Sequence, residues 1–203
     1  MFEDTMKLFV NPASGHAYKV RLMMAVAGIS CDYEEIDIFS ARDSRPEDFR
    51  SNSKFSEVPT LIDGGEAFVQ SNAILLHLAQ KHQVLGGQDA VQFNRCKEWL
   101  FWEANKIGMS LPQLRYAAMF DDHDLNEGAL LWLRSRYDYD IAVMENELSD
   151  GRAFFLGDEM TIADCSLAGY LYFADEAKLP VPKHVQAWLD HLAALPEWFH
   201  PYD

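Results

Sequence analysis

A serine near the N-terminus stands where a short apolar run gives way to a stretch with helical spacing. In the segment VNPASGHAYKVRL (10–22), Ser14 follows Asn11 and Pro12 and precedes the first helical turn. That turn has unpaired N–H groups and the positive end of the helix dipole, so an anion placed there is stabilised. Ser14 could donate a hydrogen bond to such an anion or only cap the helix, and its position alone favours the cap.

Two further segments place proline or small polar residues at the ends of predicted strands. EVPTL (57–61) has Pro59 where a strand should start, which suits either a strand edge left open for a ligand or a plain loop. QSNAIL (70–75) puts Gln70 and Ser71 before another helix, as a second anion site or as another cap. All three segments end a loop near the same edge of the predicted sheet.

The composition limits the classes of partner. The chain of 203 residues has 17 Lys+Arg against 32 Asp+Glu, a formal net charge of −15. Phosphate binding needs a basic surface, so this balance argues against nucleic acid and against anionic membrane surfaces. No apolar stretch is long enough to cross a bilayer, and the N-terminus lacks the pattern of a signal peptide. We expect a cytoplasmic protein with no membrane partner.

The cysteines and histidines suggest neither a redox pair nor a metal site. An odd number of cysteines without a CxxC motif fits reduced, buried thiols. These cysteines are Cys31, Cys96 and Cys165. Two pairs of histidines lie on predicted helices without a third ligand, namely His77 with His82 and His184 with His191. We therefore expect no metal ion.

The pattern of the chain changes near residue 85. Before it, the order strand, helix, strand, helix, strand, strand, helix predicts a small mixed sheet with helices on its faces. These elements are 7–10, 15–28, 32–38, 44–49, the two strands around Gly64-Gly65, and 71–82. The glycines of VLGGQD mark a linker, so we expect domains at 1–83 and 91–203 joined by 84–90. Residues 1–5 are expected to be loosely held.

Nearly everything after this linker is predicted to be helical. One long aromatic-rich helix covers about 91–116 and is expected to kink at Pro112. Further helices cover 125–148, 160–174 and 183–195.

The segment MTIADCSLAGYLYFA carries the signature of a helix N-terminus. Thr161 and Asp164 have the spacing of a capping box, and Met160 and Cys165 have that of a hydrophobic staple. We interpret these residues as the start of a buried helix, with no part in chemistry.

Four segments together resemble the cytosolic glutathione S-transferases. They are NPASGHAYKVRL, FSEVPTL, QSNAILLHLA and TIADCSLAGYL, and their order and separation span both halves of the chain. The resemblance, to serine-type and bacterial-like members, implies a thioredoxin-like α/β N-terminal domain and an all-α C-terminal domain, the glutathione transferase fold. It also implies a homodimer and a cis peptide bond before Pro59.

The resemblance assigns roles to the residues that match the motifs of the family. Ser14 matches the serine that hydrogen-bonds the glutathione sulfur, and Val58 matches the residue whose backbone pairs with the cysteinyl unit like an added strand. Gln70 and Ser71 match the pair that holds the γ-glutamyl end. Only a thiolate is a good nucleophile, and a hydrogen bond plus a helix N-terminus lowers the thiol pKa. Ser14 would therefore stabilise the thiolate and need not act as a base.

One position departs from the pattern of the family. Glu57 stands where relatives often have Gln or Lys, and its charge would not attract the glycyl carboxylate of glutathione. Arg42 or Lys54 could compensate. His16 could reach the thiol region, although a place on the helix surface is the expectation.

The small hydrophobic electrophile is expected in a pocket between the domains, lined by the long helix. The candidate residues, for which ordinary core or surface positions are an equally good alternative, are Phe101, Asn105, Met109, Arg115 and Tyr116.

The leading interpretation is an enzyme of detoxification that adds glutathione to such electrophiles, or has the related glutathione peroxidase activity. A glutathione-dependent thiol–disulfide or dehydroascorbate reductase would carry cysteine at or beside Ser14, whereas residues 13–16 are Ala-Ser-Gly-His. A third interpretation is a non-catalytic binding or interaction module of the same fold, for which Glu57 leaves room.

Overall fold

The computed structural model describes residues 6–203, so the prediction for residues 1–5 lies outside the described part. Four short strands form one sheet in the order β2-β1-β3-β4. They are β1 (Lys7–Val10), β2 (Asp32–Glu35), β3 (Thr60–Asp63) and β4 (Glu66–Val69). β1 and β2 are parallel and the other two pairs are antiparallel, which confirms the small mixed sheet.

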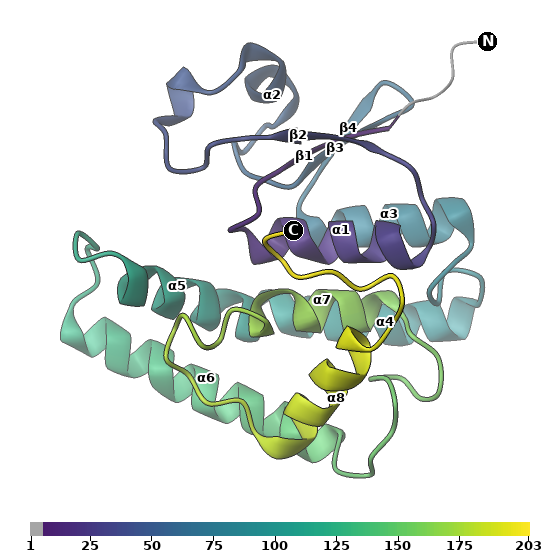
Figure 1. Cartoon of the computed structure of the whole chain (residues 1–203), viewed down its shortest axis with the longest axis vertical. Coiled ribbons are helices and arrows are strands. Elements are labelled where there is room, and N and C mark those ends of the chain that lie inside the picture. Colours follow the sequence, from purple (N-terminus) through teal and green to yellow (C-terminus); the bar gives the residue numbers. More distant parts are fainter. Residues whose placement is uncertain (1–5) are drawn as a thin grey trace.

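Helices cover both faces of this sheet (Figure 1). α1 (Gly15–Val26) and α3 (Ser71–His82) pack on the face that is turned toward the helical half of the molecule. On the other face, α2 (Glu47–Asn52) inserts Phe49, whose ring meets that of Phe9 edge-on at 5.4 Å between centroids. This is the thioredoxin-like arrangement that the resemblance implies.

The turn between β3 and β4 is the hairpin that the Gly64-Gly65 pair predicts. Both glycines have positive φ, 59° and 79°, as a two-residue turn of this kind requires. The register pairs Thr60 with Val69. The start of β3 therefore lies beside the end of β4, and the loops that precede Thr60 and follow Val69 reach the same edge of the sheet.

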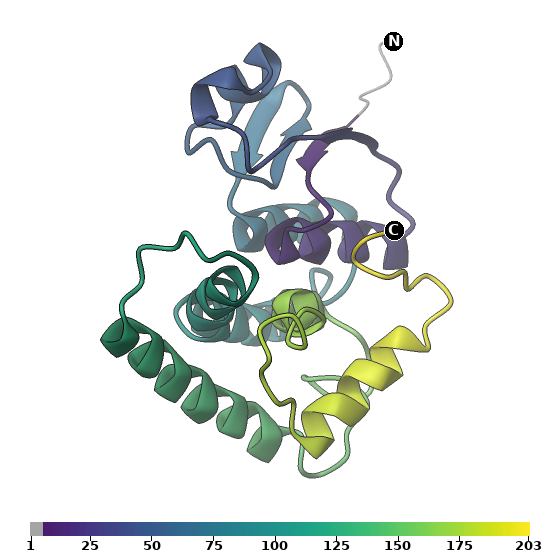
Figure 2. The ribbon, with the colours of Figure 1, turned by 60° about the vertical axis from the view of Figure 1, so that its left-hand side comes forward.

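Five helices follow in the described chain. They are α4 (Ala90–Ala104), α5 (Ile107–Met119), α6 (Glu127–Glu147), α7 (Ile162–Leu171) and α8 (Lys183–Ala193). Every residue of α7 is buried, and the other helices pack around it (Figure 2). Within residues 6–203, no helix combines the length and the apolar character needed to cross a membrane.

The long helix predicted over about 91–116 is two helices, α4 and α5, and the break between them was not predicted. The break lies at Lys106, whose φ of −125° and ψ of −106° are not helical, whereas Pro112 lies inside α5. The break comes directly after the turn that carries Glu103, whose side chain points into the protein toward Lys19. Periodicity alone gave no reason to bury a glutamate there.

The N-terminus of α7 forms the predicted capping box. The Thr161 N–H donates to Asp164 Oδ2 at 2.9 Å, and the Thr161 hydroxyl oxygen accepts from the Ala163 N–H at 3.2 Å. Asp164 is fully buried and also accepts from the Phe155 N–H at 2.8 Å and from Trp188 Nε1 at 3.0 Å. The structural interpretation of this segment is confirmed, because every contact of the carboxylate holds neighbouring backbone or core in place.

The two halves of the chain meet along α1 and α7, and a buried ion pair lies beside that contact. Lys19 Nζ lies 2.6 Å from Glu103 Oε1, and the two side chains are 0% and 1% exposed. The second oxygen of Glu103 accepts from Asn72 Nδ2 at 3.0 Å and from the Ser166 hydroxyl at 3.4 Å. This cluster joins α1, α3, α4 and α7, and so it fixes the starts of α1 and α3 relative to each other.

Candidate functional site

A short loop holds Ser14 at the start of α1. The Asn11 side chain donates to the Ile36 carbonyl and accepts from the Ala13 N–H, both at 2.9 Å. The Asn11 carbonyl accepts from the Ser14 N–H at 2.9 Å. Ser14 is the N-cap of α1, and its Oγ accepts from the Ala17 N–H at 3.2 Å. Because this cap uses only a lone pair, the hydroxyl proton of Ser14 can be donated to a second partner.

A cavity of about 70 Å³ lies where β3 and α3 begin, and we call it the Val58 cavity. Its lining residues are His16, Phe55, Glu57, Val58, Pro59, Val69, Gln70 and Ser71. The structure thus brings together the three segments that the sequence singled out. The Val58–Pro59 bond is cis, as the resemblance implies. Within residues 6–203, neither the N–H nor the carbonyl of Val58 makes a hydrogen bond, so both can pair with an extended ligand.

The N-terminus of α3 opens into the same cavity. Its N-cap residue, Gln70, has a φ of 70° and makes no side-chain cap hydrogen bond. The first N–H groups of α3 therefore have no cap, and the hydroxyl of Ser71 makes no hydrogen bond within the described residues. Unpaired N–H groups at the positive end of a helix dipole form a site for an anion such as a carboxylate.

Glu57 places a negatively charged side chain at the Val58 cavity. Its side chain accepts from Gln70 Nε2 at 3.4 Å. The two cations proposed to compensate lie elsewhere: Arg42 is exposed in a 3₁₀ turn, and Lys54 lies over the Phe55 ring at 4.8 Å. Neither of them lines the Val58 cavity.

Sequence reasoning missed the cation that shapes this region, which is Arg45. It is buried, and its guanidinium donates to the Ser56 carbonyl at 2.6 Å and to the Ile38 carbonyl at 2.8 Å. Arg45 therefore holds the loop that presents Val58. An arginine beside a proline at a helix start reads as a solvated residue, so the sequence offered no signal for this role.

The expectation that His16 lies on the surface of the helix is wrong. Its ring lines the Val58 cavity on one side and meets the Tyr170 ring edge-on at 4.8 Å on the other. Nδ1 is enclosed and has no hydrogen-bond partner among the described residues. Burial, with a smaller contribution from the charge of Lys19, lowers the pKa of His16 to about 3, so the imidazole is neutral at physiological pH.

We expect this histidine to make the protein less stable in acid. The unfolded chain takes up a proton near pH 6.5 and the folded chain only near pH 3, so unfolding is favoured as the pH falls between these values. Urea unfolding of the wild type and of His16→Phe between about pH 7 and pH 5 should give curves that diverge, by up to about 1.4 kcal/mol per pH unit. The exposed His191→Phe is the control, and parallel curves for His16→Phe would refute the assignment.

A second cavity, of about 110 Å³, adjoins the loop of Ser14, and we call it the Tyr116 cavity. Its lining residues are Ala13, Ile38, Phe39, Pro112, Arg115, Tyr116, Met119, Phe120 and Tyr170. Its walls are largely apolar, as a pocket for a hydrophobic compound requires. Along the chain, Ser14 stands between Ala13, which lines this cavity, and His16, which lines the Val58 cavity.

The structure brings two of the five candidate pocket residues to the Tyr116 cavity. Arg115 and Tyr116 line it, whereas Phe101, Asn105 and Met109 do not. Phe101 is 72% exposed on α4. The break before α5 separates Phe101 and Asn105 from the helical face of Arg115 and Tyr116, whereas Met109 lies on α5 itself, outside the cavity.

Tyr170 of α7 is a residue of the site that the sequence did not indicate. Its ring lies against Gly15, where an added Cβ would come within 2.7 Å of the ring carbons. Burial raises the pKa of Tyr170 to about 12, and the side chain of Ser14 acts in the opposite direction. The phenol is therefore protonated at neutral pH beside Ser14. In the sequence it is one of many apolar residues of a buried helix.

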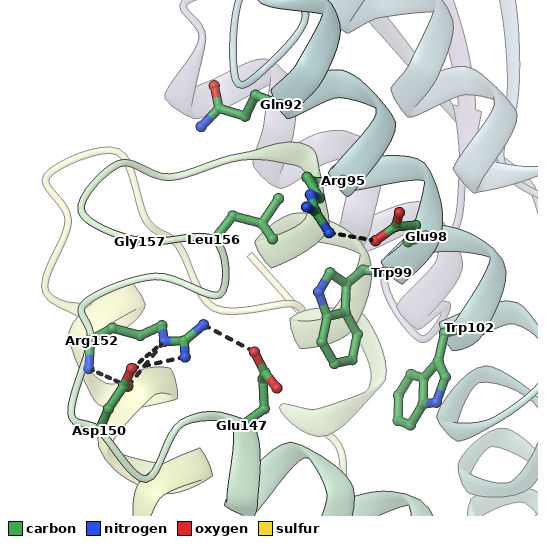
Figure 3. Close-up of a pocket in the computed structure, with 10 residues that line it drawn as sticks. All are labelled: Gln92, Arg95, Glu98, Trp99, Trp102, Glu147, Asp150, Arg152, Leu156 and Gly157. Atoms are coloured by element: carbon green, nitrogen blue, oxygen red, sulfur yellow. Dashed lines mark hydrogen bonds and ion pairs between the residues drawn. The ribbon is translucent and has the colours of Figure 1, made fainter.

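A larger cavity, of about 700 Å³, lies away from this site (Figure 3). α4, the end of α6 and the loop 150–157 form its walls, with Trp99 and Trp102 on the helical side. Its two arginines are already paired with carboxylates. Arg95 of α4 pairs with Glu98, and Arg152 on the other side of the cavity pairs with Glu147 and Asp150 beside it. None of the residues predicted for the site lines it.

The cysteines of the chain lie apart from the loop of Ser14. The three cysteines are free, and burial is the main cause that raises the pKa of each thiol. None of them lines either cavity beside Ser14. Within residues 6–203, no three or more His, Cys, Asp or Glu side chains are grouped to hold a metal ion.

Comparison with known proteins matches both halves of the chain. The family model "Glutathione S-transferase, N-terminal domain" matches residues 8–87, and "Glutathione S-transferase, C-terminal domain" matches residues 116–191. Glutathione S-transferase P 1 of Xenopus laevis is 27% identical over 165 residues, 79% of this chain and 72% of that protein.

Solved structures agree with these matches. A possible glutathione S-transferase from Rhodopseudomonas palustris superposes with a TM-score of 0.86 and 29% identity, covering 97% of this chain and 98% of that one. A glutathione transferase family member from Pseudomonas fluorescens, solved with two glutathione molecules bound, has a TM-score of 0.81 at 23% identity, covering 97% and 92%. Since the two domain models together span both halves of the fold, the chain belongs to the glutathione S-transferase family.

Proposed function

We propose that this protein is a serine-type, bacterial-like glutathione transferase that adds glutathione to small hydrophobic electrophiles. One observation carries the proposal: the unpaired backbone of Val58 and the uncapped start of α3 line one cavity together with His16, which lies two residues after Ser14. The family membership and the glutathione bound to the Pseudomonas fluorescens relative support it.

Each part of the site fits one part of glutathione. The cysteinyl unit pairs with the N–H and carbonyl of Val58 as an added strand. The γ-glutamyl carboxylate accepts hydrogen bonds from the Ser71 hydroxyl and from the first N–H groups of α3, with Gln70 beside it. The sulfur then lies at the start of α1, within reach of the Ser14 hydroxyl.

Ser14 acts on the thiol by stabilising its charged form. The thiol proton leaves to solvent, and the thiolate accepts the hydroxyl proton of Ser14 as a hydrogen bond beside the positive end of α1. The sulfur lone pair forms a bond to an electrophilic carbon held in the Tyr116 cavity. The bond to the leaving group breaks, and the leaving group departs with its electron pair. The same thiolate could attack a peroxide oxygen: the S–O bond would form, the O–O bond would break and the alcohol would leave with the electron pair and a proton from solvent. A second glutathione would then displace water from the resulting sulfenic acid and form the disulfide, which is glutathione peroxidase activity.

The proposal includes a cytoplasmic homodimer. Large apolar side chains stay exposed along the outer helices, among them Val91 at 70% and Phe101 at 72% on α4. A second copy that covers them would remove this surface from water.

The two other interpretations receive less support. A thiol–disulfide reductase needs a reactive cysteine at the site, and neither cavity beside Ser14 contains one. A non-catalytic binding module is favoured by a single observation, which is the acidic side chain of Glu57 in the Val58 cavity. The negative charge of Glu57 would weaken binding of the glycyl carboxylate without affecting the sites for the cysteinyl and γ-glutamyl units.

Removing the hydroxyl of Ser71 should weaken glutathione binding. A hydrogen bond to a carboxylate contributes about 1.5–3 kcal/mol, so we expect Ser71→Ala to raise the dissociation constant roughly tenfold or more. Isothermal titration calorimetry with glutathione measures this change, and Ser51→Ala on the exposed face of α2 is the matched control. Equal affinity in Ser71→Ala and wild type would show that the carboxylate is held elsewhere.

A further inference from the structure

Arg115 reaches from the helical half of the molecule to the loop that carries Ser14. Its Nη1 donates to the carbonyl of Ala13, the residue before Ser14, at 2.6 Å. Its Nε donates to Glu176 at 2.6 Å, and its guanidinium carbon lies 4.0 Å from the centre of the Phe173 ring. The side chain is only 7% exposed, so the guanidinium is committed to the protein, although one edge of the residue lines the Tyr116 cavity.

The fourth partner of Arg115 comes from the C-terminal end of the chain. Arg115 Nη2 donates to the Tyr202 hydroxyl at 2.8 Å, and that hydroxyl donates to Glu176 Oε1 at 2.8 Å. The Tyr202 ring also meets the Phe173 ring edge-on at 5.5 Å. Arg115, Glu176 and Tyr202 are thus joined pairwise by hydrogen bonds. A further hydrogen bond links Arg115 of this triangle to the carbonyl of Ala13.

Tyr202 belongs to the C-terminal segment, residues 196–203, which also hydrogen-bonds to α1. The Tyr18 hydroxyl donates to the Phe199 carbonyl at 2.9 Å, and Arg21 donates to the Pro201 carbonyl at 2.8 Å. The segment runs from α8 back across the molecule and ends beside α1 (Figures 1 and 2). The segment therefore holds α1, the helix that Ser14 caps, through Tyr18 and Arg21.

We propose that Arg115 is a positioning residue for Ser14, and that the C-terminal segment holds Arg115 in place through Tyr202. The guanidinium fixes the Ala13 carbonyl, and hence the direction in which the Ser14 hydroxyl points. Its planar fork serves Ala13, Glu176 and Tyr202 at once, which a lysine cannot do. Arg115 thus acts through the loop of Ser14, although one edge of the residue also lines the Tyr116 cavity. This role in catalysis rests on the proposed function, whereas the effect on the loop does not.

Two conservative variants of the full-length protein separate position from charge. Arg115→Lys keeps the charge but loses the fork, and Tyr202→Phe keeps the ring on Phe173 but loses one hydroxyl. The matched controls lie on the outer face of α6: Arg134→Lys, which disturbs an exposed pair with Asp138, and Tyr139→Phe, which is 68% exposed.

Two measurements are made on each variant. Amide hydrogen exchange of the peptide covering residues 11–18 reports the loop directly, without substrate. The pH dependence of kcat/KM, with calorimetric affinity for glutathione, reports the thiol. We expect both variants to exchange at least about threefold faster in this peptide and to move the acidic limb of the pH profile upward, with affinity changed by less than about twofold.

The outcomes distinguish this inference from the proposed function. Exchange and pH profiles equal to wild type in Tyr202→Phe and Arg115→Lys would overturn the inference, and so would full rescue by lysine, since charge alone would then suffice. If Arg115→Lys does not fold, Tyr202→Phe decides alone. If wild-type protein fails to bind glutathione, the proposed function fails, and hydrogen exchange still shows whether Arg115 and Tyr202 hold the loop.

Discussion

Ser14→Ala should lower kcat for glutathione conjugation on the order of a hundredfold while leaving the affinity for glutathione nearly unchanged. The loss is of the size found when one hydrogen-bond donor to a developing or stabilised anion is removed. We expect binding to be retained because the proposed site holds the rest of glutathione through Val58, Gln70 and Ser71. The thiol of bound glutathione should then ionise only at higher pH, so activity should recover in part in alkaline buffer. Steady-state kinetics across pH, with calorimetry at neutral pH, measures all three effects.

The same substitution removes an N-cap, and a control must separate that loss from the catalytic one. The Ser14 Oγ accepts from the Ala17 N–H, so its removal should cost about 1 kcal/mol of stability. Asn126→Ala removes the equivalent cap of α6, where Asn126 Oδ1 accepts from the Ala129 N–H at 2.9 Å, and Asn126 lines neither of the two cavities. We expect Asn126→Ala to lose similar stability with unchanged kcat. Equal kcat for Ser14→Ala and wild type would remove Ser14 from the mechanism.

Breaking the buried ion pair between the two halves should cause the largest loss of stability. Lys19→Met leaves Glu103 without its cation, and Glu103→Gln leaves Lys19 without its anion, although both positions are almost completely buried. Burial lowers the pKa of Lys19, and Glu103 opposes that shift, so removing Glu103 disfavours the charged lysine further. Each single variant should lose about 3–5 kcal/mol of unfolding free energy, measured in urea at fixed protein concentration.

The double variant tests whether the loss comes from an unpaired charge. Lys19→Met with Glu103→Gln removes both charges, and the Gln oxygen can still accept from Asn72 and Ser166. We expect its loss to be smaller than the sum of the two single losses by about 2 kcal/mol or more. The exposed pair of Arg95 and Glu98 is the control, where Arg95→Met should cost less than about 1 kcal/mol. Additive losses in the buried pair would contradict this account of the interface.

The positions of Ser14, Pro59 and Ser71 could be predicted because each stands at a boundary between elements. Boundaries leave local signals, such as a cap, a proline that cannot donate or a pair of glycines, and these signals do not depend on distant contacts. The antiparallel register of β3 and β4 then brings two of the boundaries to one edge, and the Gly64-Gly65 pair already predicted the hairpin to which that register belongs.

The residues that sequence reasoning misplaced all depend on contacts between distant segments. His16 turns inward because Tyr170, from the other half of the chain, covers it, and Phe101 turns outward because the helix breaks after Glu103. Arg115 lines the Tyr116 cavity, but sequence reasoning gave none of its hydrogen-bond partners, because three of them lie 61, 87 and 102 residues away along the chain. Helical spacing says which residues share a face, but not what that face meets.

The most direct test of the proposed function is the ultraviolet absorbance of glutathione thiolate in the wild-type complex, titrated across pH. Stabilisation by Ser14 and the start of α1 predicts a saturable thiolate signal at neutral pH, well below the usual thiol pKa of about 8.5. The signal should move to higher pH in Ser14→Ala at equal occupancy of the site. Bound glutathione that ionises only near the pKa of the free thiol, in wild type and variant alike, would contradict it.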